Sequence, residues 1–248
     1  MKLSLTILSF LFIFSCKQPE EKKNLETSEK QLVNEEKPQA EKDVLISQKK
    51  YSLNDILVTV TQAKNYNSQD RCKLKLVISR DNILIDSLTF SPEAVGGYYG
   101  ISTPKRIENH LVFTKHGDYD GRTIIVNDQG QVFNIIGGKN FFDSESKMLF
   151  TIYGSDLSGF AVFDLKNDST IMKMPEIEDR PFSFHKAFGE RYFILSSNDE
   201  TPMNEMSIWE IEFDMERIMK VDIDTNEINE MNILQSWELE DVNCECEK

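Results

Sequence analysis

Residues 111–128 read LVFTKHGDYDGRTIIVND, and residues 149–164 repeat the pattern as LFTIYGSDLSGFAVFD. Each copy holds two short apolar runs around a loop rich in Gly, Asp and Ser, and Phe113 and Phe150 stand at equivalent places 37 residues apart. A polar turn after Asn127 or Asp164 leads into a further strand-like run. Short runs of Val, Ile and Phe between such turns are typical of β-strands, so this repeat predicts an all-β fold.

Two looser copies flank this pair. An earlier, partial copy runs from Leu76–Ser79 through a turn at residues 80–82 into a strand that begins at Ile83. A later copy runs from Tyr192–Leu195 to Met219–Asp222, with an additional hairpin expected over Thr201–Phe213. A last strand is expected over Glu227–Met231, and no strong helix is expected in the body of the protein.

The succession of strand, loop, strand, turn and strand, with a period of about forty residues, resembles a blade of a β-propeller. The resemblance covers roughly Lys73–Met231 and lacks the Gly-His and Trp-Asp signatures of the WD40 family. It implies antiparallel strands in irregular propeller-like repeats. A closed small propeller, an open fragment completed by a partner and a sandwich of hairpins all agree with the pattern, and we favour the propeller-like arrangement.

The beginning of the chain has the features of an export signal. Lys2 precedes the apolar run Leu3–Phe14, which is too short to span a bilayer because a spanning helix needs roughly 20 apolar residues. The run ends in Ile13-Phe14-Ser15-Cys16, which resembles the lipobox of bacterial lipoproteins. The resemblance implies cleavage before Cys16 and acylation of that cysteine with chains such as palmitate, which would anchor the product in a membrane.

The residues after Cys16 predict a flexible tether. Lys17–Lys50 contains no aromatic residue and holds eight lysines against eight acidic residues, so it lacks the apolar surface needed to fold. Its first residues, Lys17–Glu21, resemble the export signal of lipoproteins in Bacteroidota-type bacteria. This resemblance favours a location in the outer membrane of the cell envelope, in either of its two leaflets. The expected organisation is a signal peptide over residues 1–15, a lipidated cysteine and tether over 16–50, and a β domain over 51–248.

The charge of the chain is concentrated at one end. Of 28 basic and 42 acidic residues, Tyr51–Lys248 holds 19 and 34, and Asp199–Lys248 alone holds 3 and 16. Because a phosphate backbone requires a basic surface, this balance argues against nucleic acid as a partner. The acids alternate with apolar residues over Ile208–Phe213, as in a half-buried strand, so they are expected to lie on a structured surface.

Cysteines and histidines supply few candidate sites. In an oxidising envelope, Cys72 is a candidate disulfide partner for Cys244 or Cys246. His110, His116 and His185 lack the spacing of a zinc site, and we expect them to be isolated surface or turn residues.

Two loops supply weaker candidates. Asp118 and Asp120 are weak candidates for calcium ligands, and a calcium site would be better supported if Asp156 lay close to them. Turn formation explains the same residues, so no metal is expected. Tyr98 and Tyr99, among glycines, form a candidate platform for a sugar or peptide ligand, or pack inward in a loop.

These features favour an envelope-anchored lipoprotein with a non-catalytic binding or assembly role towards a protein or a carbohydrate. No cofactor is expected, and the protein would meet the membrane through its N-terminal lipid. Two alternatives stay open. An envelope hydrolase would need two carboxylates that converge in a pocket. An immunity or inhibitor lipoprotein would use an acidic concave surface to block a basic toxin.

Lipidation at Cys16 makes the first prediction. We expect Cys16→Ser to abolish incorporation of labelled palmitate and to leave the signal uncleaved, because both steps need the thiol. Metabolic labelling with and without globomycin measures the two effects. Unchanged labelling and processing in the variant would contradict the lipoprotein assignment.

Overall fold

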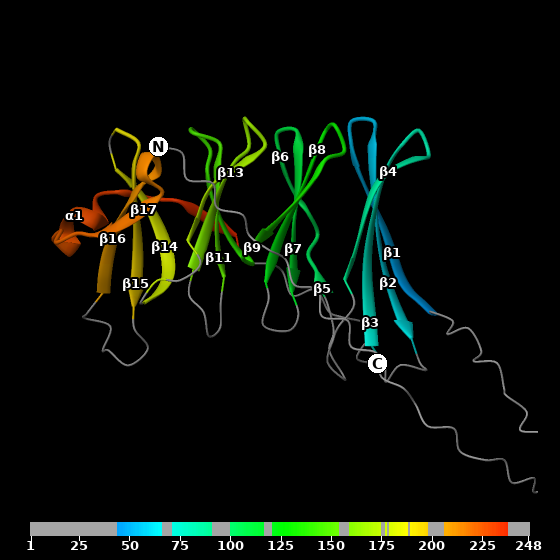
Figure 1. Cartoon of the computed structure of the whole chain (residues 1–248), viewed down its shortest axis with the longest axis horizontal. Coiled ribbons are helices and arrows are strands. Elements are labelled where there is room, and N and C mark those ends of the chain that lie inside the picture. Colours follow the sequence, from blue (N-terminus) through cyan, green and yellow to red (C-terminus); the bar gives the residue numbers. More distant parts are fainter. Residues whose placement is uncertain are drawn as a thin grey trace, which may run out of the picture. The chain divides into compact units, whose positions relative to one another are not determined.

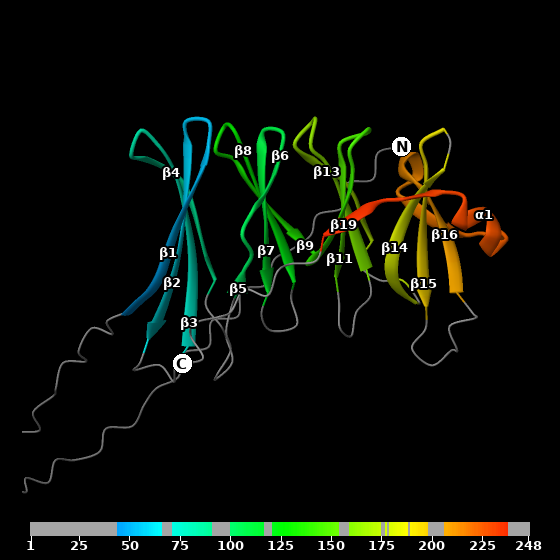
Figure 2. The same ribbon diagram turned by 180° about the vertical axis from the view of Figure 1, so that it is seen from behind.

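The computed structural model describes residues 44–65, 71–90, 100–116, 121–153, 159–174, 177, 179–187, 189–197 and 206–237. In this part of the chain, antiparallel strands form four sheets, called sheets 1 to 4 in chain order (Figures 1 and 2). Each sheet is built mainly from consecutive strands, so that neighbours along the chain are also neighbours in the sheet. This is the arrangement of propeller blades, and the prediction of an all-β fold with propeller-like repeats is confirmed.

The first two sheets come from the first half of the chain. Sheet 1 contains β1 (Val44–Leu53), β2 (Ile56–Asn65), β3 (Arg71–Arg80) and β4 (Ile83–Phe90). Sheet 2 contains β5 (Gly100–Ile101), β6 (Lys105–Ile107), β7 (His110–His116), β8 (Arg122–Asn127) and β9 (Val132–Ile136). β5 and β6 pair with opposite ends of β7, so together they form one interrupted first strand.

The last two sheets each gain a strand from the C-terminal segment. Sheet 3 contains β10 (Lys139–Asp143), β11 (Met148–Tyr153), β12 (Gly159–Asp164) and β13 (Ser169–Met174), and sheet 4 contains β14 (Arg180–Ala187), β15 (Arg191–Ser197), β16 (Met206–Glu212) and β17 (Arg217–Lys220). A 3₁₀ helix (Phe213–Met215) and α1 (Thr225–Asn229) follow β16 and β17. β18 (Asn232–Ile233) then pairs with β14, and β19 (Gln235–Trp237) pairs with β10.

The repeat in the sequence corresponds to equivalent positions in sheets 2 and 3. Phe113 and Phe150 lie in β7 and β11, and both are fully buried. Asn127 and Asp164 end β8 and β12, and each side chain accepts a backbone amide of the following turn, from Gln129 at 3.1 Å and from Lys166 at 2.8 Å. The apolar residue is therefore repeated for packing and the polar residue for turn formation.

Successive sheets pack face to face through apolar clusters. One cluster joins sheets 1 and 2 and contains Ile78 and Phe113; another joins sheets 2 and 3 and contains Ile125 and Leu149. Sheets 3 and 4 share the aromatic cluster around Phe184. The ring of Phe184 lies 4.9 to 5.7 Å, between centroids, from the rings of three phenylalanines of sheet 3, namely Phe141, Phe150 and Phe160.

Polar bridges accompany the apolar contacts at every interface. Arg80 donates to the carbonyl of Asp128 between sheets 1 and 2, Asp168 binds His110 between sheets 2 and 3, and Asp143 binds Lys186 between sheets 3 and 4. Buried charges cost desolvation energy, so such pairs add less to stability than their short distances suggest. The Asp143–Lys186 pair restricts how sheets 3 and 4 align, because a shifted sheet would leave one of these two buried charges without a partner.

The ordered body begins earlier than the sequence predicted. β1 starts at Val44, inside the range 16–50 that was expected to be tether, and Lys49 and Lys50 lie within the strand. The boundary prediction is wrong because β1 pairs with β2 over almost its whole length, from Val44 with Lys64 to Leu53 with Ile56. Pairing to a neighbouring strand supplies the stability that the polar composition of this segment does not.

Two further expectations about the last repeat are wrong. Ser207–Phe213 is not part of an inserted hairpin, because β16 is the central partner of β15 and β17 in sheet 4. Glu227–Met231 is not a strand, because Thr225–Asn229 is a short helix whose N-cap residue, Asp224, accepts the amide of Asn226 at 2.9 Å. Among the described residues, neither helix has the length and apolar character needed to cross a membrane.

The aromatic cluster between sheets 3 and 4 makes the second prediction. We expect Phe184→Ala to lower the free energy of unfolding by about 3 to 5 kcal/mol, because it leaves a cavity among three rings. Phe182→Ala is the matched control, since Phe182 lies two residues away on the same strand and is 36% exposed. Urea unfolding measures both, and an equal cost for the two variants would contradict this assignment of the core.

Candidate functional site

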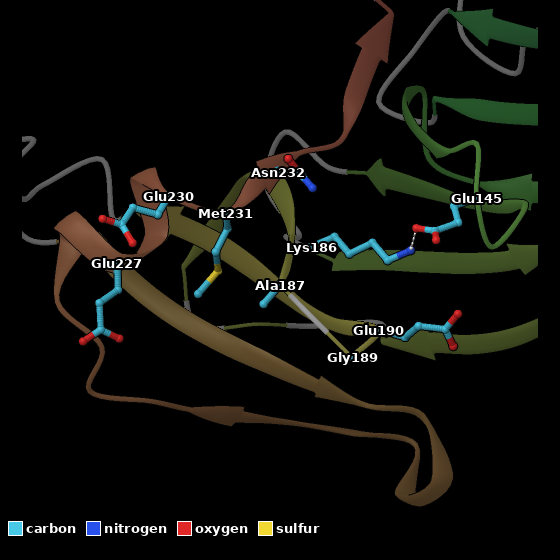
Figure 3. A pocket seen from close by; sticks show the side chains of 9 residues that line it. All are labelled: Glu145, Lys186, Ala187, Gly189, Glu190, Glu227, Glu230, Met231 and Asn232. Atoms are coloured by element: carbon cyan, nitrogen blue, oxygen red, sulfur yellow. Dashed lines mark hydrogen bonds and ion pairs between the residues drawn. The ribbon is translucent and has the colours of Figure 1, made fainter.

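A cavity of about 700 Å³ opens at the end of sheet 4 and is rich in glutamate (Figure 3). Four lining residues are acidic, and Lys186 is the single basic one. Ala187 and Met231 add apolar surface. The lining consists of Glu145, Lys186, Ala187, Gly189, Glu190, Glu227, Glu230, Met231 and Asn232.

Three parts of the chain meet around this cavity. Lys186 and Ala187 end β14, and Gly189 and Glu190 belong to the turn into β15. Gly189 has a φ of +80°, a conformation that L residues with side chains rarely adopt, so glycine suits this turn. Glu145 comes from the turn between β10 and β11 of sheet 3.

The third part is the C-terminal segment around α1. Ile228 of α1 is buried against the face of sheet 4 that points away from sheet 3, in a cluster with Phe193 and Ile208. Glu227 and Glu230, on either side of Ile228, line the cavity. The burial of one apolar residue therefore positions both carboxylates.

Lys186 lies at the centre of a buried polar network between sheets 3 and 4. Its ammonium group is 2.9 Å from Asp143 Oδ2 and donates to Glu145 Oε2 at 2.8 Å. Asp143 Oδ2 also accepts hydrogen bonds from Tyr192 Oη at 2.6 Å and from Ser146 Oγ at 2.7 Å. The side chains of Lys186 and Asp143 are 9% and 6% exposed, so the positive charge of the cavity is already neutralised from within.

The network keeps both ionisable groups charged. Burial by itself would raise the pKa of Asp143, but the hydrogen bonds from Tyr192, Lys186, Ser146 and the amide of Glu145 hold that pKa well below its usual range. Burial would lower the pKa of Lys186, but its bonds to Glu145 and Asp143 raise it above its usual range. Burial and the bond to Asp143 raise the pKa of Tyr192 to about 12, so its phenol is a neutral donor.

A second polar network joins sheets 2 and 3. Asp168 Oδ1 is 2.7 Å from His110 Nε2, and Asp168 Oδ2 accepts from Asn127 Nδ2 at 2.7 Å. Deeper in the interface, Asn140 donates to Thr114 at 2.8 Å and accepts from Thr123 at 2.8 Å. These contacts pair polar groups between packed sheets, with His110 Nδ1 left without a hydrogen-bond partner in the described part of the chain. None of these residues lines the cavity of sheet 4, so we interpret the contacts as structural.

Two of the three histidines differ from the sequence prediction, whereas His116 is exposed as predicted. His110 and His185 are not surface or turn residues, because they lie in β7 and β14 and are 6% and 4% exposed. His185 is 3.0 Å from Ser183 Oγ, and burial lowers the pKa of its ring. Among the described residues, no group of three or more His, Cys, Asp or Glu could hold a metal ion.

Most of the other predicted site residues lie outside the described part of the chain. They are the lipidation residue Cys16, the cysteines Cys244 and Cys246, the platform residues Tyr98 and Tyr99, and the calcium candidates Asp118, Asp120 and Asp156. Cys72 is the second residue of β3. The disulfide, the platform and the calcium site therefore stay predictions.

Sequence reasoning missed the residues of the cavity. Lys186 and Asp143 are 43 residues apart in sequence, and no motif announces their pairing. A weak signal existed for Glu227 and Glu230, because the sequence places the excess acidic charge in the same C-terminal region. The sequence thus indicates where the acidic residues are, but it does not predict that they line a cavity.

Comparisons with known proteins concern the fold. The chain matches no protein-family model and no curated protein. It is similar to the solved β-propeller domain of the Trilobed protease from Pyrococcus furiosus, with a TM-score of 0.34, 10% identity, and coverage of 73% of this chain and 57% of that chain. It is also similar to the acylaminoacyl peptidase of Pyrococcus horikoshii (TM-score 0.31, 12% identity, coverage of 73% and 32%).

A third similar structure is a puromycin-hydrolysing peptidase of Mycobacterium tuberculosis, with a TM-score of 0.27, 11% identity, and coverage of 72% of this chain and 29% of that chain. The chain spans less than two thirds of the length of each of these three structures.

The buried network makes the third prediction. We expect Asp143→Asn to lower the free energy of unfolding by about 3 kcal/mol near neutral pH, because it leaves the buried ammonium of Lys186 without a full partner. An unfolded Asp has a pKa of about 3.9, and the pKa of Asp143 in the folded protein is lower. The ionised Asp143 therefore stabilises the folded protein fully above about pH 3.9, and this stabilisation decreases as the pH falls below that value. The wild type should therefore lose more stability than the variant between about pH 5 and about pH 3.

Urea unfolding across this pH range measures the difference. Asp214→Asn removes a carboxylate from the exposed 3₁₀ helix and serves as the control, with stability close to wild type expected throughout. Equal acid sensitivity of the wild type and Asp143→Asn would show that the network does not hold this carboxylate ionised.

Proposed function

We propose that this protein is a lipid-anchored, non-catalytic binding protein of the bacterial envelope, and that it receives a basic segment of a partner protein in the glutamate-rich cavity of sheet 4. The observation that carries the proposal is the charge of the cavity lining. Four glutamates surround an apolar patch, while the one lysine is held by Asp143 and Glu145.

The chemistry of the lining favours a cationic ligand with an apolar stem. Carboxylates attract ammonium and guanidinium groups, and their combined field raises the local concentration of a basic partner. Lys and Arg side chains also carry methylene chains, which can pack on Met231 and Ala187. A basic protein segment satisfies both requirements, and so does the basic toxin of the immunity alternative.

A protein partner fits this cavity better than a carbohydrate. Sugar recognition commonly uses the flat face of an aromatic ring, and the nine lining residues include no aromatic side chain. The aromatic platform suggested for carbohydrate, Tyr98 and Tyr99, lies outside the described residues. We therefore commit to a protein ligand for the cavity.

The hydrolase alternative receives less support from the buried network. A carboxylic general acid needs a raised pKa so that it holds a proton at the working pH. Asp143, the most deeply placed carboxylate beside the cavity, has its pKa held low by four donors and serves Lys186. This arrangement suits a structural anion better than an acid catalyst.

The envelope location rests on the N-terminal sequence. Cys16 and the preceding apolar run support export and lipidation, and the charged residues that follow support the outer membrane. Between Cys16 and the start of β1 at Val44 the chain offers roughly 27 residues of polar sequence, with a typical reach of about 30 Å if it is flexible. The β body would then sample its surroundings near the membrane surface.

The cavity makes the fourth prediction. We expect the wild type to bind a fluorescently labelled lysine-rich peptide, and we expect the double variant Glu227→Gln, Glu230→Gln to bind it about threefold to tenfold more weakly at low salt. The physical reason is the loss of two favourable charge interactions, each worth about 0.2 to 1 kcal/mol at an exposed site. Fluorescence anisotropy measures the affinity, which should fall as salt rises.

The matched control removes two charges elsewhere. Asp214→Asn with Glu216→Gln gives the same change in net charge on the exposed hairpin between β16 and β17, and we expect nearly wild-type affinity. An equal loss in both double variants would reduce the effect to net charge. Absence of binding by the wild type would remove the proposed role of the cavity.

A further inference from the structure

The C-terminal segment Asn232–Trp237 crosses from sheet 4 to sheet 3 along their first strands (Figure 2). β18 adds antiparallel to β14, and β19 adds antiparallel to β10. Leu234, between the two strands, is buried in the cluster shared by the two sheets, and its amide donates to Phe184 O at 2.9 Å. The segment thus pairs with one sheet, buries an apolar residue in the interface, and pairs with the next sheet.

Trp237 packs between sheets 3 and 2, as Leu234 packs between sheets 4 and 3. It pairs with Asn140 of β10 and so lies on the same face of sheet 3, the face from which Asn140 bonds to Thr114 of sheet 2. Trp237 packs on the cluster that contains Ile107, and Lys105 Nζ lies 4.1 Å from the centroid of its ring. Lys105 and Ile107 belong to β6, so the described chain leaves sheet 3 beside the first strand of sheet 2.

β6 presents an open and basic edge at this place. It pairs with β7, and no other strand of the described residues pairs with it. Lys105 is half-buried and Arg106 is exposed, and within the described chain no carboxylate forms an ion pair with Lys105. Burial lowers the pKa of Lys105, so a carboxylate beside it would favour its charged form. An unpaired strand edge also leaves backbone donors and acceptors free for another strand.

The sequence after Trp237 is complementary to that edge. Residues 238–242 read ELEDV, with three acidic side chains. The step from Ile233 on sheet 4 to Gln235 on sheet 3 takes two residues, so a step of the same length from Trp237 brings Leu239 to sheet 2. An extended chain advances about 3.3 Å per residue, and the three residues Leu239–Asp241 therefore match the length of the three-residue strand β6.

We propose that Leu239–Asp241 adds an antiparallel strand to the edge of β6 that no described strand occupies, with the carboxylates of Glu240 and Asp241 beside Lys105 and Arg106. The orientation follows from the repeat, because β14, β10 and β6 are first strands of successive sheets and the C-terminal segment runs antiparallel to the first two. The end of this same chain is the occupant, since Trp237 delivers it to the edge. One segment then binds sheets 4, 3 and 2 in succession.

Hydrogen exchange of the full mature chain, in reducing buffer, tests the proposal. In the variant Glu240→Lys, Asp241→Lys, we expect the amides of residues 105–107 to exchange about threefold to tenfold faster, because local opening becomes easier when the added strand is repelled. Reversing the partners as well, with Lys105→Glu and Arg106→Glu, is expected to return protection towards the wild-type rate. Mass spectrometry of peptides that cover β6 provides the readout.

The control is Glu245→Lys with Glu247→Lys, which makes the same charge change beyond the proposed strand and should leave exchange in β6 unchanged. Equal acceleration by the control, or wild-type protection in Glu240→Lys, Asp241→Lys, would overturn the proposal. Protection that falls on dilution of the wild type would also overturn it, because the strand would then come from a second copy of the chain.

Discussion

The burial of one sheet face against the next is the interaction on which this structure depends. A four-stranded antiparallel sheet with an apolar face must cover that face with another layer to be stable in water. Three interfaces between successive sheets do this, through the clusters around Phe113, Leu149 and Phe184. The outward faces of sheets 1 and 4 have no neighbouring sheet among the described residues, and the two faces differ in how they meet the solvent.

The outward face of sheet 1 carries polar residues on β2 and β3, whereas that of sheet 4 is covered. On sheet 1, the positions of β2 that alternate with the buried Val58 and Val60 are half-buried and mix apolar with polar residues, and the pair Thr61 and Lys75 supplies polar groups there. On sheet 4, α1 and the residues around it lie over Phe193. The helix that the sequence did not predict therefore covers apolar surface, and it carries glutamates of the cavity with it.

The sequence predicts local features of this protein well and distant pairings poorly. The apolar periodicity places the start of β4 correctly at Ile83, since alternation and flanking turns are properties of adjacent residues. The sequence did not predict strands β10 and β14. Both contain polar residues, such as Asn140 and His185, that are buried by partners far along the chain. The cavity was not predicted for the same reason, because its lining combines a turn of sheet 3 with a helix more than eighty residues later in the sequence.

The C-terminal segment also bears on the order in which the protein folds. Strands within each sheet pair with near neighbours in sequence, which favours rapid local folding, whereas Ser236 pairs with Phe141, 95 residues earlier. A chain that emerges from its N-terminus can form sheets 1 to 3 while the edge of β10 still lacks its partner. Until the last residues arrive, that edge can pair with another chain, so rapid delivery of the C-terminus protects the nascent protein from aggregation.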